Sequence, residues 1–252
     1  MQSRTQRLLI RVSSASCLLR NILRSLLTVL WISSTVVQSQ ELKREIYIPS
    51  KEKGPAIVVV SGVSGTTAYR EYSSKLAETG YYVVLIDGKD VLILPSDTRG
   101  QDGAANLRKV IMEAQSAEKA LSGKVALVGF SLGGGGVLLH GALLKDHVAA
   151  VVAYYPAITR MGPNMQPLAS QLKAPVLVLA GEQDRYRDCC LVESMRALAA
   201  APKDVPFELI DYPDANHGFN LAIPQVYRAQ DAADAWRRTT DFLKQYHPMR
   251  SQ

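Results

Sequence analysis

A glycine-flanked serine between a strand and a helix is the feature that most constrains this chain. Residues 129–133 read Gly-Phe-Ser-Leu-Gly, and the apolar run Val125–Val128 before them predicts a buried parallel strand. The apolar residues Val137–Leu139 after them predict a helix. A serine on such a turn projects its hydroxyl from the edge of a sheet, and the residues two before and two after it must be small. The pattern marks Ser131 as a candidate nucleophile.

A glycine-rich turn of this kind can also bind phosphate or simply pack closely. A phosphate-binding P-loop would continue with a Lys-Ser or Lys-Thr pair, and a dinucleotide site would space its glycines as Gly-x-Gly-x-x-Gly. Neither pattern surrounds Ser131. The nucleophile is therefore the favoured interpretation.

Short apolar runs alternate with helical segments along the body of the chain. Strands are predicted at Leu42–Ile48 (an edge strand), Ala56–Val60, Tyr81–Ile86, Val125–Val128, Val148–Tyr154, Val176–Ala180 and Pro206–Ile210. Helices are predicted at Ala68–Thr79, Asp102–Leu121, Cys190–Ala200 and Gln225–Tyr246, besides the one behind Ser131. This alternation predicts an α/β fold with a mostly parallel central sheet and helices on both faces. No linker splits residues 40–252, so we expect one domain there.

Residues 1–39 read as an export signal. They have an arginine-rich start, an uncharged apolar run over Ser25–Val37, and small residues suited to cleavage after Ser39. The apolar run is shorter than the ~20 residues of a spanning helix. We expect a periplasmic or secreted protein. The alternatives for this segment are a mitochondrial transit peptide and an uncleaved membrane anchor. We expect contact with a membrane only if the segment stays uncleaved.

The net charge of +6 comes mostly from this leader. Five arginines precede the first acidic residue, Glu41, and the rest of the chain has 24 basic and 23 acidic residues. No basic stripe with interleaved aromatic residues follows. The composition therefore gives no reason to expect a nucleic-acid partner.

The body of the chain has two cysteines, Cys189 and Cys190, and Cys17 lies in the leader. Adjacent cysteines can bridge only through a small strained ring, so two free thiols on a helix are expected. No cluster of cysteine and histidine supplies further ligands for a metal.

Three residues that each follow a predicted strand can form a catalytic triad. Ligands of open parallel sheets bind beyond the carboxyl ends of the strands, where Ser131, Asp184 and His217 all belong. A serine needs a base to take its proton and a third group to orient that base. His217 is the expected base, because the chain's other histidines lie along a helix, on the opposite edge or in the C-terminal tail.

Asp184 is the expected acid, since it lies between the serine and the histidine in sequence, after a tight turn at Gly181. It could also be only the N-cap of the next helix. Glu182 is the reserve, and Asp211 and Asp214 fit less well because they are too near the histidine in sequence.

Two backbone N–H groups are needed to stabilise a developing oxyanion. The residue after the nucleophile, Leu132, supplies one, and Val63 in the turn after Ala56–Val60 is the expected second. The segment from Pro156 to Pro175 is too short for a large lid, so we expect an open, shallow cleft. Tyr155 is a candidate lining residue.

The sequence resembles the dienelactone hydrolase family of the α/β-hydrolase superfamily over Ala56–Tyr246. The resemblance depends on Gly-Phe-Ser-Leu-Gly-Gly at 129–134, Val-Ala-Tyr-Tyr-Pro at 152–156, Val-Leu-Val-Leu-Ala-Gly-Glu-Gln-Asp at 176–184, Tyr-Pro-Asp-Ala-Asn-His-Gly-Phe at 212–219 and Ala-Asp-Ala-Trp in the last helix. It implies an α/β-hydrolase fold with a minimal lid, and its triad matches Ser131, Asp184 and His217.

Two positions depart from the family pattern. The namesake enzymes have cysteine where this chain has Ser131, which favours a general serine carboxylesterase over a dienelactone hydrolase proper. Ser61 replaces a histidine that many relatives have before the oxyanion-hole glycine.

We therefore expect a serine hydrolase that cleaves small-molecule esters or lactones through an acyl-enzyme, with no metal and no organic cofactor. Arg160, Arg185 and Arg187 lie on the cleft side and either bind an anionic substrate or are solvated surface residues. A peptidase or polymer-ester hydrolase on the same scaffold, and a binding protein without turnover, are the alternatives. The sequence leaves the oligomeric state open.

Overall fold

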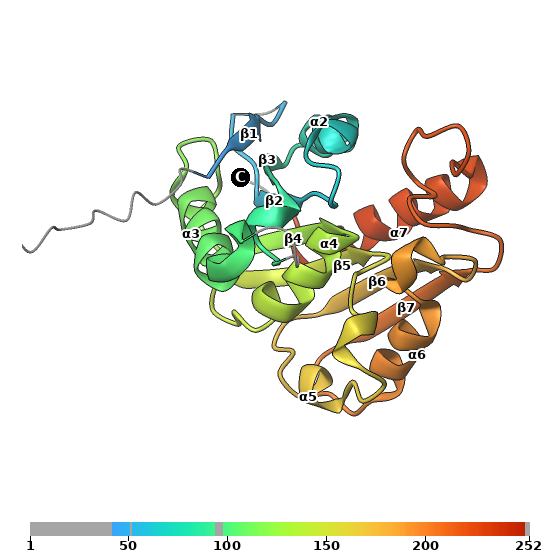
Figure 1. Cartoon of the computed structure of the whole chain (residues 1–252). Coiled ribbons are helices and arrows are strands. Elements are labelled where there is room, and N and C mark those ends of the chain that lie inside the picture. The colour runs from blue at the N-terminus through green and yellow to red at the C-terminus, as the bar shows by residue number, and fades with distance from the viewer. Residues whose placement is uncertain (1–41, 51, 94–97, 250–252) are drawn as a thin grey trace, which may run out of the picture. The chain divides into compact units, whose positions relative to one another are not determined.

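A computed structural model of the chain describes residues 42–50, 52–93 and 98–249. Its centre is a sheet with the strand order β1-β3-β2-β4-β5-β6-β7 (Figure 1). The strands are β1 Arg44–Tyr47, β2 Ala56–Val60, β3 Tyr82–Ile86, β4 Val125–Phe130, β5 Val148–Tyr154, β6 Val176–Gly181 and β7 Phe207–Tyr212. β1 pairs antiparallel with β3, and the remaining pairs of the sheet are parallel. The predicted mostly parallel sheet, with its first strand at an edge, is confirmed.

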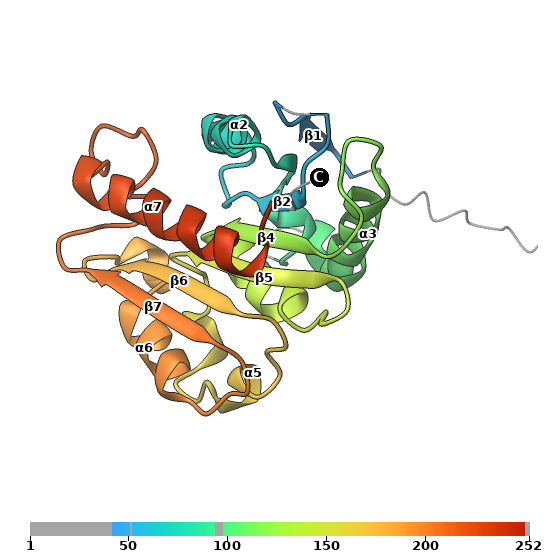
Figure 2. The ribbon, with the colours of Figure 1, turned by 180° about the vertical axis from the view of Figure 1, so that it is seen from behind.

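Helices cover both faces of this sheet, as predicted. One face packs against α2 (Arg70–Glu78) and α7 (Ala229–Tyr246), which lies across the sheet in Figure 2. The other face packs against α3 (Gly103–Ser116), α4 (Leu132–Gly136), α5 (Gln166–Ala169) and α6 (Val192–Ala200). Short helical turns are η1 Thr67–Tyr69, η2 Gly88–Asp90, η3 Arg99–Asp102, η4 Val137–Gly141, η5 Thr159–Met161 and η6 Tyr186–Asp188.

Burial of the strands explains why they pair in the centre of the fold. Every residue of β2, β3, β4 and β6 is buried, and most are valine, isoleucine or leucine. β-Branched side chains suit the pleated surface, and a parallel sheet covered on both faces has no solvated side. The two faces carry separate apolar clusters, and the central strands lie between them.

Several predicted element ends are wrong by a few residues. The helix predicted to reach Leu121 ends at Ser116, because Ala117 has extended backbone angles (φ −67°, ψ 141°). The last helix begins at Ala229 instead of Gln225, because Arg228 before it is extended. Such ends depend on backbone angles that periodicity does not report.

The predicted leader, residues 1–39, and Cys17 within it lie outside the described residues. Within the part that the structure describes, no helix combines the length and the apolar character needed to cross a bilayer.

Candidate active site

Ser131 lies on a strained turn between β4 and α4. Its backbone angles are φ 51° and ψ −114°, which a residue with a side chain rarely adopts. A Cβ atom on Gly129 would lie 2.7 Å from the Val137 side chain, and one on Gly133 would overlap the Ser61 carbonyl oxygen. The requirement for small residues at both positions is thus a direct consequence of close packing.

The structure brings the three predicted triad residues together. The His217 Nε2 atom lies 3.0 Å from the Ser131 Oγ atom, and the His217 Nδ1 atom lies 2.7 Å from the Asp184 Oδ2 atom. Ser131 follows β4, Asp184 follows β6, and His217 follows β7, so all three are at the carboxyl edge of the sheet. Both ring nitrogens of His217 are therefore engaged, one by the hydroxyl and one by the carboxylate.

Asp184 is fully buried, and both of its carboxylate oxygens accept hydrogen bonds. Oδ2 faces His217, and Oδ1 accepts from the backbone N–H of Tyr186 at 2.9 Å. The alternative that the sequence left open, Asp184 as the N-cap of the next helix, is wrong, because that position is taken by Arg185 for η6 and by Leu191 for α6. Of the other acids considered, Glu182 and Asp211 pair with Arg196, and Asp214 pairs with Arg228.

Two tyrosines enclose the His217 ring. Tyr186 stacks on it with a centroid distance of 4.5 Å and an interplanar angle of 12°, and Tyr155 lies on it at 4.7 Å and 60°. Burial raises the pKa of Tyr155 well above its usual value, and its hydroxyl donates to Asn220 Oδ1 at 2.9 Å. The sequence analysis named Tyr155 but missed Tyr186, whose only signal was its place two residues after Asp184.

The two predicted oxyanion donors lie beside the serine. Leu132 N–H is the first N–H of α4, and Val63 lies in the turn after β2. Among the described residues, neither N–H donates to a protein acceptor. Gly133 N–H, in contrast, donates to the Ser61 carbonyl at 3.1 Å, which ties the serine turn to the end of β2.

Ser131 opens onto two adjoining hollows that share Val63 and Tyr186. The first hollow, about 450 Å³, also contains Tyr69, Tyr155, Arg185, His217 and Leu221 in its wall. The second hollow, about 460 Å³, is lined by residues that include Leu92, Ile93, Leu132, Leu139, Met161 and Cys189. The serine hydroxyl thus lies between two spaces, each large enough for part of a small substrate.

The three arginines divide between these hollows. Arg185 lines the first, and Arg160 and Arg187 line the second. Arg185 donates to the backbone carbonyls of Glu182 and Asp184 at 3.0 and 2.9 Å. Their placement at the cleft agrees with the sequence analysis, and their binding of an anionic substrate stays a prediction.

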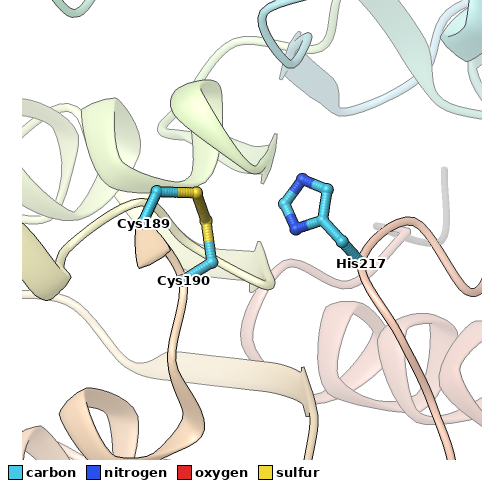
Figure 3. Close-up of side chains that lie close together, drawn as sticks. All are labelled: Cys189, Cys190 and His217. Carbon is cyan, nitrogen blue, oxygen red and sulfur yellow. A yellow bond between two sulfur atoms is a disulfide. The ribbon is translucent and has the colours of Figure 1, made fainter. Parts of the chain in front are cut away.

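The prediction of free thiols is wrong. Cys189 and Cys190 are joined as a disulfide in the loop between η6 and α6, which begins only at Val192 (Figure 3). The preceding residues Arg187 and Asp188 have positive φ angles of 50° and 49°. This irregular loop, and not a helix, accommodates the bridge between neighbouring residues.

The comparisons with known proteins agree on one family. The family model described as "Dienelactone hydrolase family" matches residues 89–247. The chain belongs to the dienelactone hydrolase family. This confirms the resemblance and the predicted class, a hydrolase of ester or lactone bonds.

Named relatives and solved structures cover most of the chain. An Escherichia coli K12 protein named "Putative carboxymethylenebutenolidase" is 30% identical over 79% of this chain and 80% of its own. A Methylorubrum extorquens protein of the same name is 28% identical over 76% and 72%. The crystal structure titled "Putative Dienelactone Hydrolase" from Klebsiella pneumoniae has a TM-score of 0.67 and 25% identity, covering 83% of this chain and 95% of that one. The α/β-hydrolase fold is thereby confirmed.

Proposed function

We propose that this chain is a serine hydrolase that cleaves small carboxylic esters or lactones through an acyl-enzyme on Ser131. The observation that carries the proposal is the position of His217, whose two ring nitrogens contact the serine hydroxyl and the buried Asp184 carboxylate at 3.0 and 2.7 Å. This is the arrangement that makes a serine nucleophilic.

The reaction begins when His217 Nε2 takes the proton from Ser131 Oγ as the oxygen attacks the ester carbonyl. The imidazolium that forms is stabilised by the Asp184 carboxylate and by the faces of Tyr186 and Tyr155. The N–H groups of Leu132 and Val63 stabilise the oxyanion of the tetrahedral intermediate. His217 then gives its proton to the leaving oxygen, which leaves an ester on Ser131.

Hydrolysis of that ester completes the cycle. His217 deprotonates a water molecule, which attacks the acyl carbonyl, and then returns the proton to Ser131 Oγ. The two hollows beside the serine suggest one space for the acyl part and one for the alcohol part of the substrate. A lactone, whose two parts stay joined, would lie across both.

The test compares the wild type with Ser131→Ala on short-chain nitrophenyl esters and on lactones. We expect the variant to lose activity on the order of 10⁴–10⁶-fold, because the nucleophile is absent. A fluorophosphonate should label Ser131 of the wild type, as found by peptide mass spectrometry. The control is Ser116→Ala, an exposed serine on α3 whose loss should change neither rate nor labelling.

The same experiment separates the alternatives. Equal rates for wild type and Ser131→Ala would refute the proposed mechanism and favour a binding protein. Cleavage of nitroanilides at rates similar to those of the esters would favour a peptidase. Labelling of another residue would refute the assignment of Ser131.

We also propose that the chain is exported and acts outside the cytosol. Disulfides persist in oxidising compartments, which suits the bridge between Cys189 and Cys190. Cell fractionation followed by N-terminal sequencing should find the mature chain in the periplasm or medium, starting near Gln40. Full-length chain in the cytosol would contradict the proposal.

A further inference from the structure

The disulfide lies directly beside the base of the proposed triad. The Sγ atoms of Cys189 and Cys190 and a ring nitrogen of His217 all lie within 4.8 Å of one another. The expectation that no cysteine and histidine residues cluster is therefore wrong, because the fold brings together residues that are distant in sequence. Figure 3 shows the imidazole facing the sulfur atoms from the loop that follows β7. Neither cysteine has a part in ester hydrolysis as proposed above, so their position calls for a separate explanation.

We propose that reduction of this disulfide creates a binding site for a thiophilic divalent cation, Zn²⁺ or Cd²⁺, with Cys189, Cys190 and His217 as its ligands. Two thiolates and one imidazole are a donor set typical of zinc, with water in the fourth position. In the oxidised protein the sulfurs are bonded to each other and offer no thiolate, so the site exists only after reduction.

The chemistry balances with a dithiol as reductant. The dithiol breaks the Sγ–Sγ bond, transfers two electrons and two protons to the cysteines, and becomes a cyclic disulfide itself. The cation then displaces the two thiol protons to solvent.

The distances suit a tetrahedral site. With metal–sulfur bonds of about 2.3 Å, two thiolates on one ion are about 3.8 Å apart. The three ligand atoms already lie within 4.8 Å, so reduction requires the sulfurs to separate while the imidazole stays close. Cys189 lines the second hollow beside Ser131, which gives an ion access from the cleft.

Arg160 and Arg187 line the same hollow and oppose a cation there. The charges of two thiolates balance those of a divalent ion, so soft thiolate donors are essential for binding. Hard cations such as Mg²⁺, which prefer oxygen ligands, are therefore not expected to bind.

Metal binding and the proposed catalysis exclude each other. Both His217 ring nitrogens are in use, one with Ser131 and one with Asp184. An ion that takes Nε2 displaces the serine hydroxyl, and one that takes Nδ1 displaces the orienting carboxylate. Whichever nitrogen binds, the proton relay is broken.

The experiment titrates the full chain with CdCl₂ in a Cys17→Ser background, so that only Cys189 and Cys190 supply thiols. One sample is oxidised, and the other is reduced with dithiothreitol and desalted without oxygen. We expect the ultraviolet thiolate-to-cadmium band in the reduced sample alone, saturating at one ion per chain. Nitrophenyl acetate hydrolysis by the reduced sample should fall at least tenfold with one equivalent of Cd²⁺ and return with a chelator.

Matched variants test the ligands and separate this proposal from the esterase proposal. Reduced Ser131→Ala should bind Cd²⁺ with the same stoichiometry, which makes the absorbance readout independent of activity. Reduced His217→Ala should bind at least tenfold more weakly, and Cys189→Ser should lose the one-to-one band. Circular dichroism verifies that each variant is folded.

Three results would overturn the proposal: equal cadmium binding by oxidised and reduced protein, binding that His217→Ala leaves unchanged, or one ion shared by two chains on gel filtration. Failure of ester hydrolysis with intact cadmium binding would refute only the esterase proposal.

Discussion

At the scale of single residues, the site is defined by what surrounds one imidazole. His217 has a carboxylate on one nitrogen, a hydroxyl on the other, the stacked ring of Tyr186 on its face and the tilted ring of Tyr155 in contact with it. Each of these contacts limits the rotation of the ring, and the carboxylate also stabilises the positive charge that the imidazole acquires during turnover. Removing these contacts one at a time distinguishes their effect on the orientation of the imidazole from their effect on its charge.

We predict that Asp184→Asn lowers kcat on the order of 10³–10⁴-fold while the chain stays folded. The amide is nearly isosteric but cannot stabilise the imidazolium, and it favours the wrong tautomer of His217. Steady-state kinetics on a nitrophenyl ester measure the effect. Asp214→Asn is the control, because that carboxylate is exposed and pairs with Arg228. An equal loss in both variants would contradict the assignment of the acid.

A milder effect is predicted for Tyr186, which acts on the ring by stacking. Tyr186→Ala should lower kcat by up to about tenfold, since aromatic pairs are worth about 0.5–1.5 kcal/mol. Tyr186→Phe keeps the ring and should restore the wild-type kcat. A loss with phenylalanine as large as that with alanine would show that the hydroxyl, and not the stacking, matters.

At the scale of elements, the serine turn depends on a helix that sequence propensity disfavours. Four of the five residues of α4 are glycine, each costing about 1 kcal/mol relative to alanine in a helix. They are required because backbone approaches them: Gly133 lies against the end of β2, and Gly135 lies against the Ala157 carbonyl. Tertiary packing, and not propensity, holds this helix behind the serine.

Gly133→Ala should therefore damage both stability and activity. The added methyl group meets the carbonyl oxygens of Val60 and Ser61, which the central strand β2 holds in place. Overpacking of this kind costs about 1–3 kcal/mol, or roughly 2–12 °C in Tm. Differential scanning calorimetry and ester kinetics measure both losses.

Gly80→Ala is the matched control for that change. Unlike Gly133, Gly80 has a positive φ angle, 107°, but its added methyl would meet the flexible end of Met249 at 3.2 Å and not backbone. It should lower stability by about 1–2 kcal/mol through backbone strain and leave kcat unchanged. Retention of activity by Gly133→Ala at the level of Gly80→Ala would refute the role of close packing at the turn.

The sequence predicted those structural features that a single local pattern determines. Apolar runs such as Val176–Ala180 predicted the strands, and the rule that ligands bind at the carboxyl ends predicted that Ser131, Asp184 and His217 would meet. Helix ends were less predictable, because a single extended residue such as Arg228 decides them.

What the sequence could not predict depends on irregular backbone. Arg187 and Asp188 have positive φ angles although neither is glycine, so nothing in their identity announces the turn. The turn lies between Tyr186, whose ring stacks on His217, and the disulfide-bonded pair Cys189 and Cys190. The stacking, the disulfide and their shared position beside the base all required the three-dimensional structure.

At the scale of the whole molecule, the buried hydroxyl of Tyr154 links the sheet to the two helices that cover one of its faces. Tyr154, at the end of β5, contacts the Thr239 hydroxyl of α7 at 2.8 Å and the Tyr72 hydroxyl of α2 at 3.3 Å. Its hydroxyl also donates to the Ala235 carbonyl at 3.2 Å. The central strand beside the nucleophile is thus tied to both helices of that face.

This burial gives the fold a predicted sensitivity to alkali. Burial raises the pKa of Tyr154 from 10.0 to about 12. Between these two values the unfolded chain loses the proton and the folded chain keeps it, so the free energy of unfolding falls as pH rises above 10. Below pH 10 the contribution is fully present. Two pKa units correspond to about 3 kcal/mol, reached only near pH 12.

Urea unfolding of the wild type and Tyr154→Phe at pH 8 and pH 11 isolates this contribution. At pH 8 the variant should be less stable by about 1–3 kcal/mol, because it leaves the Thr239 and Tyr72 hydroxyls without their partner. At pH 11 the gap should narrow by about 1 kcal/mol, since only the wild type loses the contribution of Tyr154. Tyr81, whose pKa is raised by burial alone, titrates equally in both proteins and cancels in the difference, whereas the pKa of Tyr72 is raised in part by Tyr154 and contributes to it. Tyr227→Phe, at an exposed position, should have the stability of the wild type at both pH values. If the difference in the free energy of unfolding between wild type and Tyr154→Phe is the same at pH 8 and pH 11, the buried hydroxyl does not make the fold alkali-sensitive.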